Sequence, residues 1–369
     1  MRFFSPRFFG AAFLGGWALC GTGHAAVPGC DTDHGTINGF DPVRLHAALF
    51  AFQTNSANLH GLVIKRHGAV VAECYRAGKD RSVYSLVNHT LEFDPSTRHD
   101  LRSISKSVTS LLWGIAESEN KVPPLDARAL DLMPELVGLK TAGRQDITIG
   151  HLLNMTSGLA WNESGGYGLG NPEQGLYWRS SQARYLFDRP MKDPAGQSFS
   201  YNGGGTAVLT AMLEKGVGIS LPDYARTRLF APLGITDWEW LTDIRGRPLG
   251  FAGLRMRPKD LAKIGQLLLQ HGRWNGKQIV PSTWIDASLQ PRIAAGNGFQ
   301  YGYHWWHGKT RAMGGEQAWT AAFGNGGQRL VVVPGLDLVV VVTAGMYNDE
   351  AGAIEVNKLF RQIVATVEQ

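Results

Sequence analysis

The chain has 369 residues, of which 44% are hydrophobic and 18% are charged, a balance typical of globular proteins and unlike that of disordered ones. Its 36 basic and 31 acidic residues give a net charge of +5, but no run of Lys and Arg forms the basic stripe that a nucleic-acid groove requires. The three Cys are too few for a disulfide-rich scaffold and include no CxxC metal pair.

The N-terminus has the pattern of a secretory signal peptide. Arg2 and Arg7 precede an apolar run at residues 8–19, and small residues follow up to Ala25. The apolar run is shorter than the roughly 20 residues that span a bilayer. We therefore expect cleavage after Ala25, no membrane span in the mature chain, and a periplasmic or secreted location. The alternative is an N-terminal helix that belongs to the core.

Removal of residues 1–25 changes the cysteine count. Cys20 leaves with the signal peptide, and Cys30 and Cys74 remain. Two Cys in an oxidising compartment can form one disulfide. The alternative is a pair of free, buried thiols.

The two ends of the chain are rich in strand patterns. The spacing of apolar residues predicts a helix over 43–54, and two β-rich runs at 59–65 and 70–76 flank the turn dipeptide His67-Gly68. Near the other end, four strand candidates lie at 301–306, 319–323, 329–333 and 336–343, and a final helix is predicted over 349–367. Pro334-Gly335 is the predicted turn between the last two strands.

The middle of the chain, from residue 101 to about 290, has mostly helical periodicity. One predicted helix begins near Pro258 and ends at Gly272. The simplest arrangement of these predicted elements is an α/β (α+β) fold in which helices flank one antiparallel sheet built from both chain ends. This arrangement predicts a signal peptide at 1–25, a sheet domain at 26–100 plus 291–369, and a mostly helical insert at 101–290.

A Ser-x-x-Lys pattern occurs twice, as Ser103 with Lys106 and as Ser118 with Lys121. The second copy is followed by Val-Pro-Pro, which places it on a solvated helix end. The first copy begins a helix with a buried apolar face. Residues three apart lie on one helix face, so the amine of Lys106 can reach the hydroxyl of Ser103.

This spacing suits nucleophilic catalysis. A desolvated Lys becomes a neutral amine that can accept the Ser proton. The N–H of a Ser at a helix N-terminus can also stabilise an oxyanion. The alternative is that Ser103 only caps a helix and Lys106 is a surface charge.

Five segments together resemble the serine β-lactamase and penicillin-binding protein superfamily, in its class C-like branch. These segments lie in the family's order, and the last two are most similar to 6-aminohexanoate-dimer hydrolases and related esterases: residues 103–112, 147–159, 199–206, 253–265 and 322–328. The resemblance covers roughly residues 60–345 and implies a β-lactamase-like fold.

The resemblance also implies roles for individual residues. Ser103 would be the nucleophile, Lys106 its partner in proton transfer, and Tyr201 a second general acid–base. The oxyanion hole would consist of the backbone N–H groups of Ser103 and Asn325. The implied enzyme is an exported serine hydrolase that cleaves a small ester or amide through an acyl-enzyme, without a metal or an organic cofactor.

Two departures from the family pattern concern substrate recognition. The family's Tyr-x-Asn motif becomes Tyr201-Asn202-Gly203 here, and Gly324-Asn325-Gly326 stands where β-lactam-binding members carry Lys-Thr-Gly or His-Thr-Gly. The cation of that motif pairs the substrate carboxylate, so its absence favours an uncharged ester or amide. The expected substrate-binding residues are Asn202, Gly324 and Gly326, and candidates for the pocket wall are Trp178, Trp305 and Trp306.

Two other functions are consistent with the resemblance. One is a D-alanyl-D-alanine carboxypeptidase or β-lactamase that acts on cell-wall peptide or β-lactams. The other is a non-catalytic, penicillin-binding-like sensor. The complete set of Ser103, Lys106 and Tyr201 argues against the sensor, because a protein that only binds does not need all three.

Overall fold

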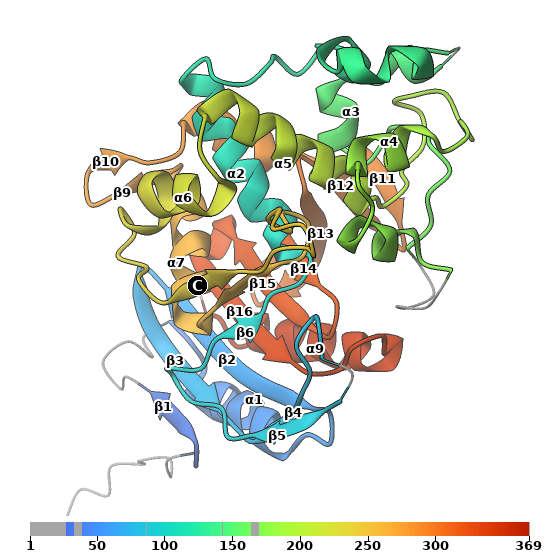
Figure 1. Cartoon of the computed structure of the whole chain (residues 1–369). Helices are drawn as coiled ribbons and strands as arrows, with labels where there is room; N and C mark the ends of the chain where they lie inside the picture. The colour runs from blue at the N-terminus through green and yellow to red at the C-terminus, as the bar shows by residue number, and fades with distance from the viewer. Residues whose placement is uncertain (1–26, 33–38, 86, 142, 164–169, 369) are drawn as a thin grey trace, which may run out of the picture.

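The computed structural model describes residues 27–368, except 33–38, 86, 142 and 164–169 (Figure 1). The predicted signal peptide, with Cys20 and the expected cleavage after Ala25, lies outside the described residues. In the part that is described, no helix has the length and apolar character needed to cross a membrane.

Within the described residues, nine strands form one antiparallel sheet in the order β1-β3-β2-β16-β15-β14-β13-β12-β11. The first three come from the N-terminal end and the rest from the C-terminal end: β1 (Cys30–Thr32), β2 (Leu59–Arg66), β3 (Ala69–Tyr75), β11 (Ile293–Gly296), β12 (Phe299–Gly302), β13 (Trp305–Ala312), β14 (Gly315–Gly324), β15 (Gln328–Val333) and β16 (Leu338–Ala344). The two sets meet where β2 pairs with β16, with Ile64 opposite Val340. The predicted sheet built from both chain ends is confirmed.

Helices cover both faces of this sheet (Figure 1). Successive side chains of a strand point to opposite faces, so Val339 and Val341 belong to one hydrophobic cluster while Val340 and Val342 belong to the other. The first cluster includes α2 (Ile104–Ser118) and α7 (Pro258–Leu269), and the second includes α1 (Pro42–Thr54) and α9 (Glu350–Val364). Burial on both faces explains the nearly continuous valine run of β16.

The region between the two sets of strands is mostly helical, as predicted. Its helices are α3 (Ile149–Leu153), the 3₁₀ helix η4 (Pro172–Tyr177), α4 (Gln182–Phe187), α5 (Gly203–Val217), α6 (Leu221–Ala225) and α8 (Ser282–Ser288). Shorter strands, which the sequence did not predict, pair outside the large sheet: β4 (Gly78–Asp80) with β5 (His89–Leu91), β9 (Arg273–Trp274) with β10 (Lys277–Gln278), and β6 (His99–Asp100) and β7 (Trp238–Trp240) with β8 (Leu254–Met256).

The expectation of a single strand over 301–306 is wrong. The chain turns between β12 and β13, where Tyr303 and His304 have φ values of 48° and 67°. Their N–H groups donate to the Asn154 side chain and to the Leu153 carbonyl at the end of α3. These hydrogen bonds replace those of a continuous strand, and they join the sheet to the helical region.

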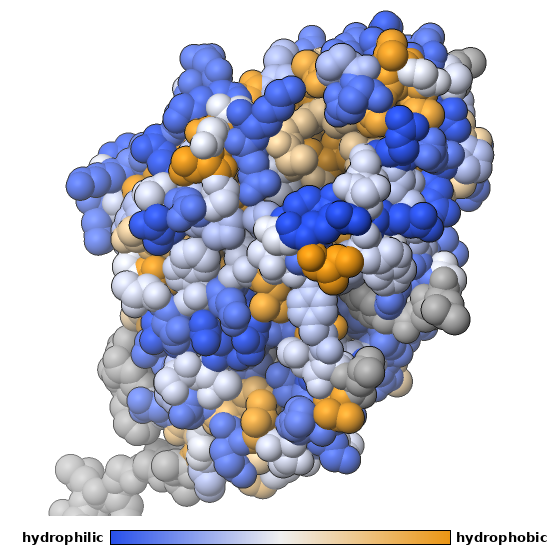
Figure 2. Space-filling model, viewed as in Figure 1, coloured by the Kyte–Doolittle hydropathy of each residue, from blue (hydrophilic) through white to orange (hydrophobic). Residues whose placement is uncertain are grey.

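Cys30 and Cys74 are joined by a disulfide. They lie directly opposite each other in the antiparallel pair of β1 and β3, with Cα atoms 4.0 Å apart. The bond fixes the three-residue strand β1 to the edge of the sheet. On the face seen in Figure 2, polar side chains predominate and apolar ones form small separate patches.

Candidate active site

Ser103 lies at the N-terminal end of α2, after a turn that the neighbouring strand holds in place. Arg102 has a φ of 52°, a left-handed conformation that is unfavourable for residues other than Gly. The Ser105 hydroxyl donates to the Arg102 carbonyl and accepts the N–H of Leu254 in β8. The N–H of Leu101 donates to the Leu254 carbonyl. The position of Ser103 is therefore fixed by hydrogen bonds on both sides of it.

Lys106 is fully buried, one helical turn after Ser103. Its Nζ lies 2.9 Å from Ser103 Oγ and 3.0 Å from the Phe251 carbonyl oxygen, and 3.6 Å separates it from Glu173 Oε2. The alternative of a surface lysine is wrong. Three oxygen atoms surround an amine that carries three donors when protonated, so the geometry suits the ammonium form.

The charge of Lys106 follows from opposing effects. Burial acts to lower the pKa of Lys106, but the acidic groups of Tyr201, Glu173 and Glu163 outweigh it and raise that pKa above its usual value. Burial alone would give the neutral amine expected from the sequence. Its neighbours instead keep Lys106 charged at neutral pH.

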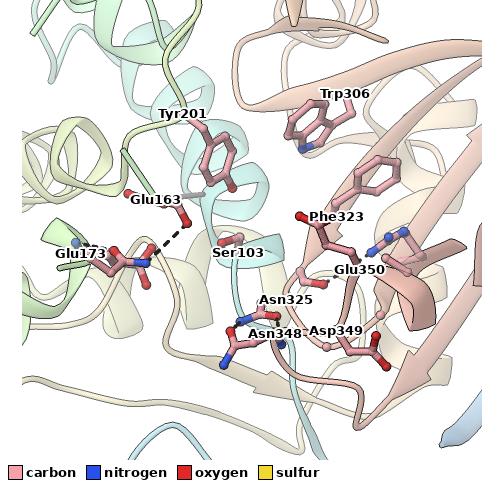
Figure 3. A pocket seen from close by; sticks show the side chains of 16 residues that line it. Ser103, Glu163, Glu173, Tyr201, Trp306, Phe323, Asn325, Asn348, Asp349 and Glu350 are labelled. Carbon is pink, nitrogen blue, oxygen red and sulfur yellow. Dashed lines mark hydrogen bonds between the residues drawn. The ribbon is translucent and has the colours of Figure 1, made fainter. Parts of the chain in front are cut away.

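Tyr201 lies just before α5, and Figure 3 shows its hydroxyl pointing toward Ser103. Lys106 Nζ lies 4.9 Å from the centroid of the phenol ring. Its ring stacks on Trp306 with centroids 5.7 Å apart and meets Tyr301 edge-on at 6.1 Å. Burial raises the pKa of Tyr201, against the opposite effect of Lys106, so the phenol is neutral in the resting site.

Asn202 and Gly203, the two residues after Tyr201, make different hydrogen bonds. The Asn202 side chain accepts the N–H of Gly205 at 3.1 Å and caps α5. The described lining of the cavity does not include Asn202, so this residue holds the helix that follows Tyr201. The N–H of Gly203 donates to Glu163 Oε1 at 2.5 Å.

A cavity of about 570 Å³ opens above Ser103 (Figure 3). Tyr201, Trp306 and Phe323 form an aromatic wall on one side of Ser103, and Figure 3 shows Glu163 and Glu173 on the other. Its described lining is Ser103, Glu163, Asn171, Glu173, Tyr201, Trp306, Phe323, Gly324, Asn325, Gly326, Gly327, Arg329, Asn348, Asp349, Glu350 and Ala353. Of the three tryptophans considered from the sequence, Trp305 is buried in the core and Trp178 is half exposed outside this lining.

The glycine-rich segment after β14 lies at the edge of this cavity. Gly326 has a φ of 92°, which favours Gly at this position. The Asn325 and Asn348 side chains hydrogen bond at 2.8 Å, and Asn325 Oδ1 accepts the Asn348 N–H at 2.9 Å. The Asn325 side chain is therefore held by the segment before α9, and its backbone remains beside the cavity.

The sequence did not predict a cation in the cavity wall, but Arg329 supplies one. It is buried behind Phe323, with its guanidinium 4.3 Å from that ring. It donates to the Gln328 carbonyl at 2.9 Å, and burial lowers its pKa to about 10. The side chain is thus still charged at neutral pH. The sequence offered no motif for Arg329, Glu163 or Glu173, because each comes from a segment without a recognisable spacing to Ser103.

Family comparison agrees with this geometry. The model of the family described as Beta-lactamase matches residues 61–360. The chain belongs to the beta-lactamase family. The chain is a serine hydrolase with a β-lactamase-like fold.

Individual relatives of this beta-lactamase family member include other proteins named as hydrolases. A 6-aminohexanoate-dimer hydrolase from Paenarthrobacter ureafaciens is 25% identical over 300 residues, covering 76% of this chain and 70% of that protein. The structure is similar to EstCE1, a hydrolase with promiscuous acyltransferase activity, with a TM-score of 0.65, 17% identity, and coverage of 88% and 98%. It is also similar to a class C beta-lactamase from Rhodobacter sphaeroides, with a TM-score of 0.62, 15% identity, and coverage of 87% and 99%.

Proposed function

We propose that the protein cleaves a small ester or amide through an acyl-enzyme formed on Ser103. The observation that carries this proposal is the 2.9 Å contact between Lys106 Nζ and Ser103 Oγ, at a point where Tyr201 also contacts Ser103. Ser103 lines the cavity, so its hydroxyl is accessible to a substrate.

The proposed reaction has two halves. Ser103 Oγ attacks the carbonyl carbon while its proton passes to the phenol oxygen of Tyr201, and the phenol gives its own proton to the leaving alcohol or amine. The negative charge on the tetrahedral intermediate is stabilised by the N–H groups of Ser103 and Asn325. Water then attacks the acyl-enzyme and gives a proton to the phenol oxygen of Tyr201 as the phenol returns its own proton to Ser103 Oγ, which releases the acid and free Ser103.

The cavity wall supports an acyl group with an apolar portion. Trp306 and Phe323 stack on each other with ring centroids 5.5 Å apart, and both line the cavity with Gly324. The named substrate of the Paenarthrobacter ureafaciens relative contains an amide, which supports amides as well as esters. Since no cationic side chain stands at 324–326, we propose substrates without a carboxylate next to the scissile bond.

We also propose that the protein is exported. The pattern of residues 1–25 is that of a signal peptide. The disulfide between Cys30 and Cys74 is the second support, because disulfides persist mainly in oxidising compartments. Expression with and without residues 1–25, followed by fractionation and N-terminal sequencing, tests both the export and the cleavage after Ala25.

The catalytic role of Ser103 is tested with p-nitrophenyl esters, short amides and nitrocefin. We expect Ser103→Ala to lose at least about 10³-fold in kcat/KM and to lose the stoichiometric burst of leaving group. Ser118→Ala is the matched control, because Ser118 belongs to the other Ser-x-x-Lys pattern and bonds only to the Ile115 carbonyl among its described partners. Full turnover by Ser103→Ala would overturn the proposal, and efficient hydrolysis of nitrocefin alone would favour the β-lactamase alternative.

A further inference from the structure

Glu163 and Glu173 lie near Lys106, in the space that the missing side chain of Gly203 leaves free. A Cβ atom on Gly203 would lie 3.1 Å from both Glu163 Oε1 and Glu173 Oε2. The two oxygens are therefore no farther apart than twice that distance. A larger residue at position 203, such as the Asn expected from the resemblance, would displace one of them.

Both carboxyl groups are held in place. Glu163 Oε1 accepts hydrogen bonds from Trp161 Nε1 at 2.6 Å and from the Gly203 N–H at 2.5 Å. Glu173 lies in η4, is 2% exposed, and faces Lys106 at 3.6 Å. Both carboxyl groups lie beside the same ammonium, and a negative charge on one opposes ionisation of the other.

The charges beside Lys106 follow from this geometry. Burial and the charge of Glu173 raise the pKa of Glu163 to about 8. Glu163 is therefore mostly protonated at neutral pH. The ammonium of Lys106 is paired with the Glu173 carboxylate at 3.6 Å.

We propose that Glu163 and Glu173 form a coupled carboxyl pair that holds Lys106 as an ammonium ion, so that Tyr201 relays the proton of Ser103: the phenol oxygen takes that proton as the phenol gives its own proton to the leaving group. The inference rests on the proposed function of Ser103. Both glutamates are positioning residues in this scheme, because they act through Lys106, which contacts Ser103 directly. A fixed cation beside the phenol stabilises the negative charge that develops on its oxygen as the phenol proton leaves for the substrate.

The pair also predicts how activity depends on pH. The titratable groups facing Glu163 are Glu173, Lys106, Tyr177, Tyr201 and Tyr301. The pKa values of the three tyrosines and of Lys106 are raised, so Glu163 is the group that changes its charge first as pH increases. Its ionisation adds a second negative charge, which opposes the negative charge that develops on the Tyr201 oxygen and the oxyanion on the substrate.

The test compares kcat and KM from pH 5 to pH 10 for the wild type, Glu163→Gln, Glu173→Gln and the double variant. We expect kcat/KM of the wild type to fall above about pH 8, and each single variant to lose this fall because the second charge cannot form. The amide oxygen that Glu163→Gln introduces can still accept from Trp161 and Gly203. Glu316→Gln, an exposed glutamate paired with Lys309, is the matched control and should keep the wild-type profile.

The double variant removes the charge that faces Lys106. We expect its kcat to fall about tenfold and its KM to change less than about twofold, with the Lys106 titration moving down by at least about one pH unit. NMR of ¹⁵Nζ-labelled lysine in the Ser103→Ala background measures this titration without turnover, and Lys106→Met assigns the signal.

The outcomes separate the two proposals. An active Ser103→Ala variant contradicts the proposed function and leaves the NMR titration to decide on the carboxyl pair. An alkaline fall that persists in either single variant, an unchanged Lys106 titration in the double variant, or variants that raise only KM would each overturn the carboxyl pair.

Discussion

Gly324 at the end of β14 packs directly against the carbonyl oxygen of Leu101, two residues before Ser103. A Cβ atom at position 324 would lie closer than 3.0 Å to that oxygen. This contact sets the distance between the strand and the N-terminus of α2. The proposed oxyanion hole needs one N–H from each side of this contact, so it depends on the absence of a side chain at position 324.

Gly324→Ala is therefore expected to lower kcat/KM by at least about 10-fold and to cost about 1–3 kcal/mol in free energy of unfolding, because the added methyl forces the two backbones apart. Steady-state kinetics and urea unfolding measure the two effects. Gly138→Ala is the control, because nothing lies within 4 Å of a Cβ atom there. Wild-type kinetics for Gly324→Ala would show that this spacing is not required.

Asn202→Ala is expected to affect stability more than substrate binding. The Asn202 side chain caps α5, and loss of such a cap costs about 1 kcal/mol. We expect a lower urea midpoint and a KM within about twofold of the wild type. Asn202→Ser, which can still cap the helix, should recover the midpoint. A large rise in KM in both variants would instead support the substrate-binding role first expected for Asn202.

Removal of the disulfide is expected to destabilise the fold without changing catalysis. The bond closes a separation of 44 residues, for which loop-closure entropy predicts about 3–4 kcal/mol. The double variant Cys30→Ala/Cys74→Ala should unfold at lower urea concentration and keep its kcat. The disulfide joins β1 and β3 at one edge of the sheet, and β2, β16 and β15 separate these two strands from β14, which ends at the cavity. Dithiothreitol should destabilise the wild type and leave the double variant unchanged.

Glu163 is expected to make the folded protein less stable as pH rises. Its pKa is raised in the fold from 4.5 to about 8, so the folded state binds more protons than the unfolded state between these values. The stabilising contribution is complete below the unfolded value and is lost as pH approaches 8. Urea unfolding of Glu163→Gln between pH 5 and pH 8 should show a stability that falls less steeply than that of the wild type. Parallel curves for the two proteins would contradict a shifted Glu163.

The sequence was most informative where periodicity and burial agree. The hairpin of β2 and β3, the helix that begins after Ser103, and the valine-rich β16 were predicted because each has a strong local pattern. The strand over 301–306 was predicted wrongly because Tyr303 and His304 owe their turn to hydrogen bonds with Asn154 and Leu153. Such contacts join segments far apart in the sequence and leave no local pattern.

The same distinction applies to the candidate site. Ser103 and Lys106 have a helical spacing with a mechanical reason, and Tyr201 became a candidate only through the family resemblance. Glu163, Glu173 and Arg329 could not be found, because their importance depends on which segments face Lys106 and the cavity in three dimensions. The charge of Lys106 shows the consequence, since burial alone predicts a neutral amine, and Tyr201 together with Glu173 and Glu163 reverses that effect.

The pairing of β2 with β16 also constrains how the protein folds. These two interior strands are neighbours in the sheet but lie far apart in the sequence, so the chain must close a very long loop before this strand pair can form. A nascent chain that lacks β16 leaves β2 with one unpaired edge, which neither β3 nor the helical region can satisfy. The sheet therefore completes its folding only after β16 has been synthesised, and the incomplete chain is exposed to aggregation and proteolysis until then.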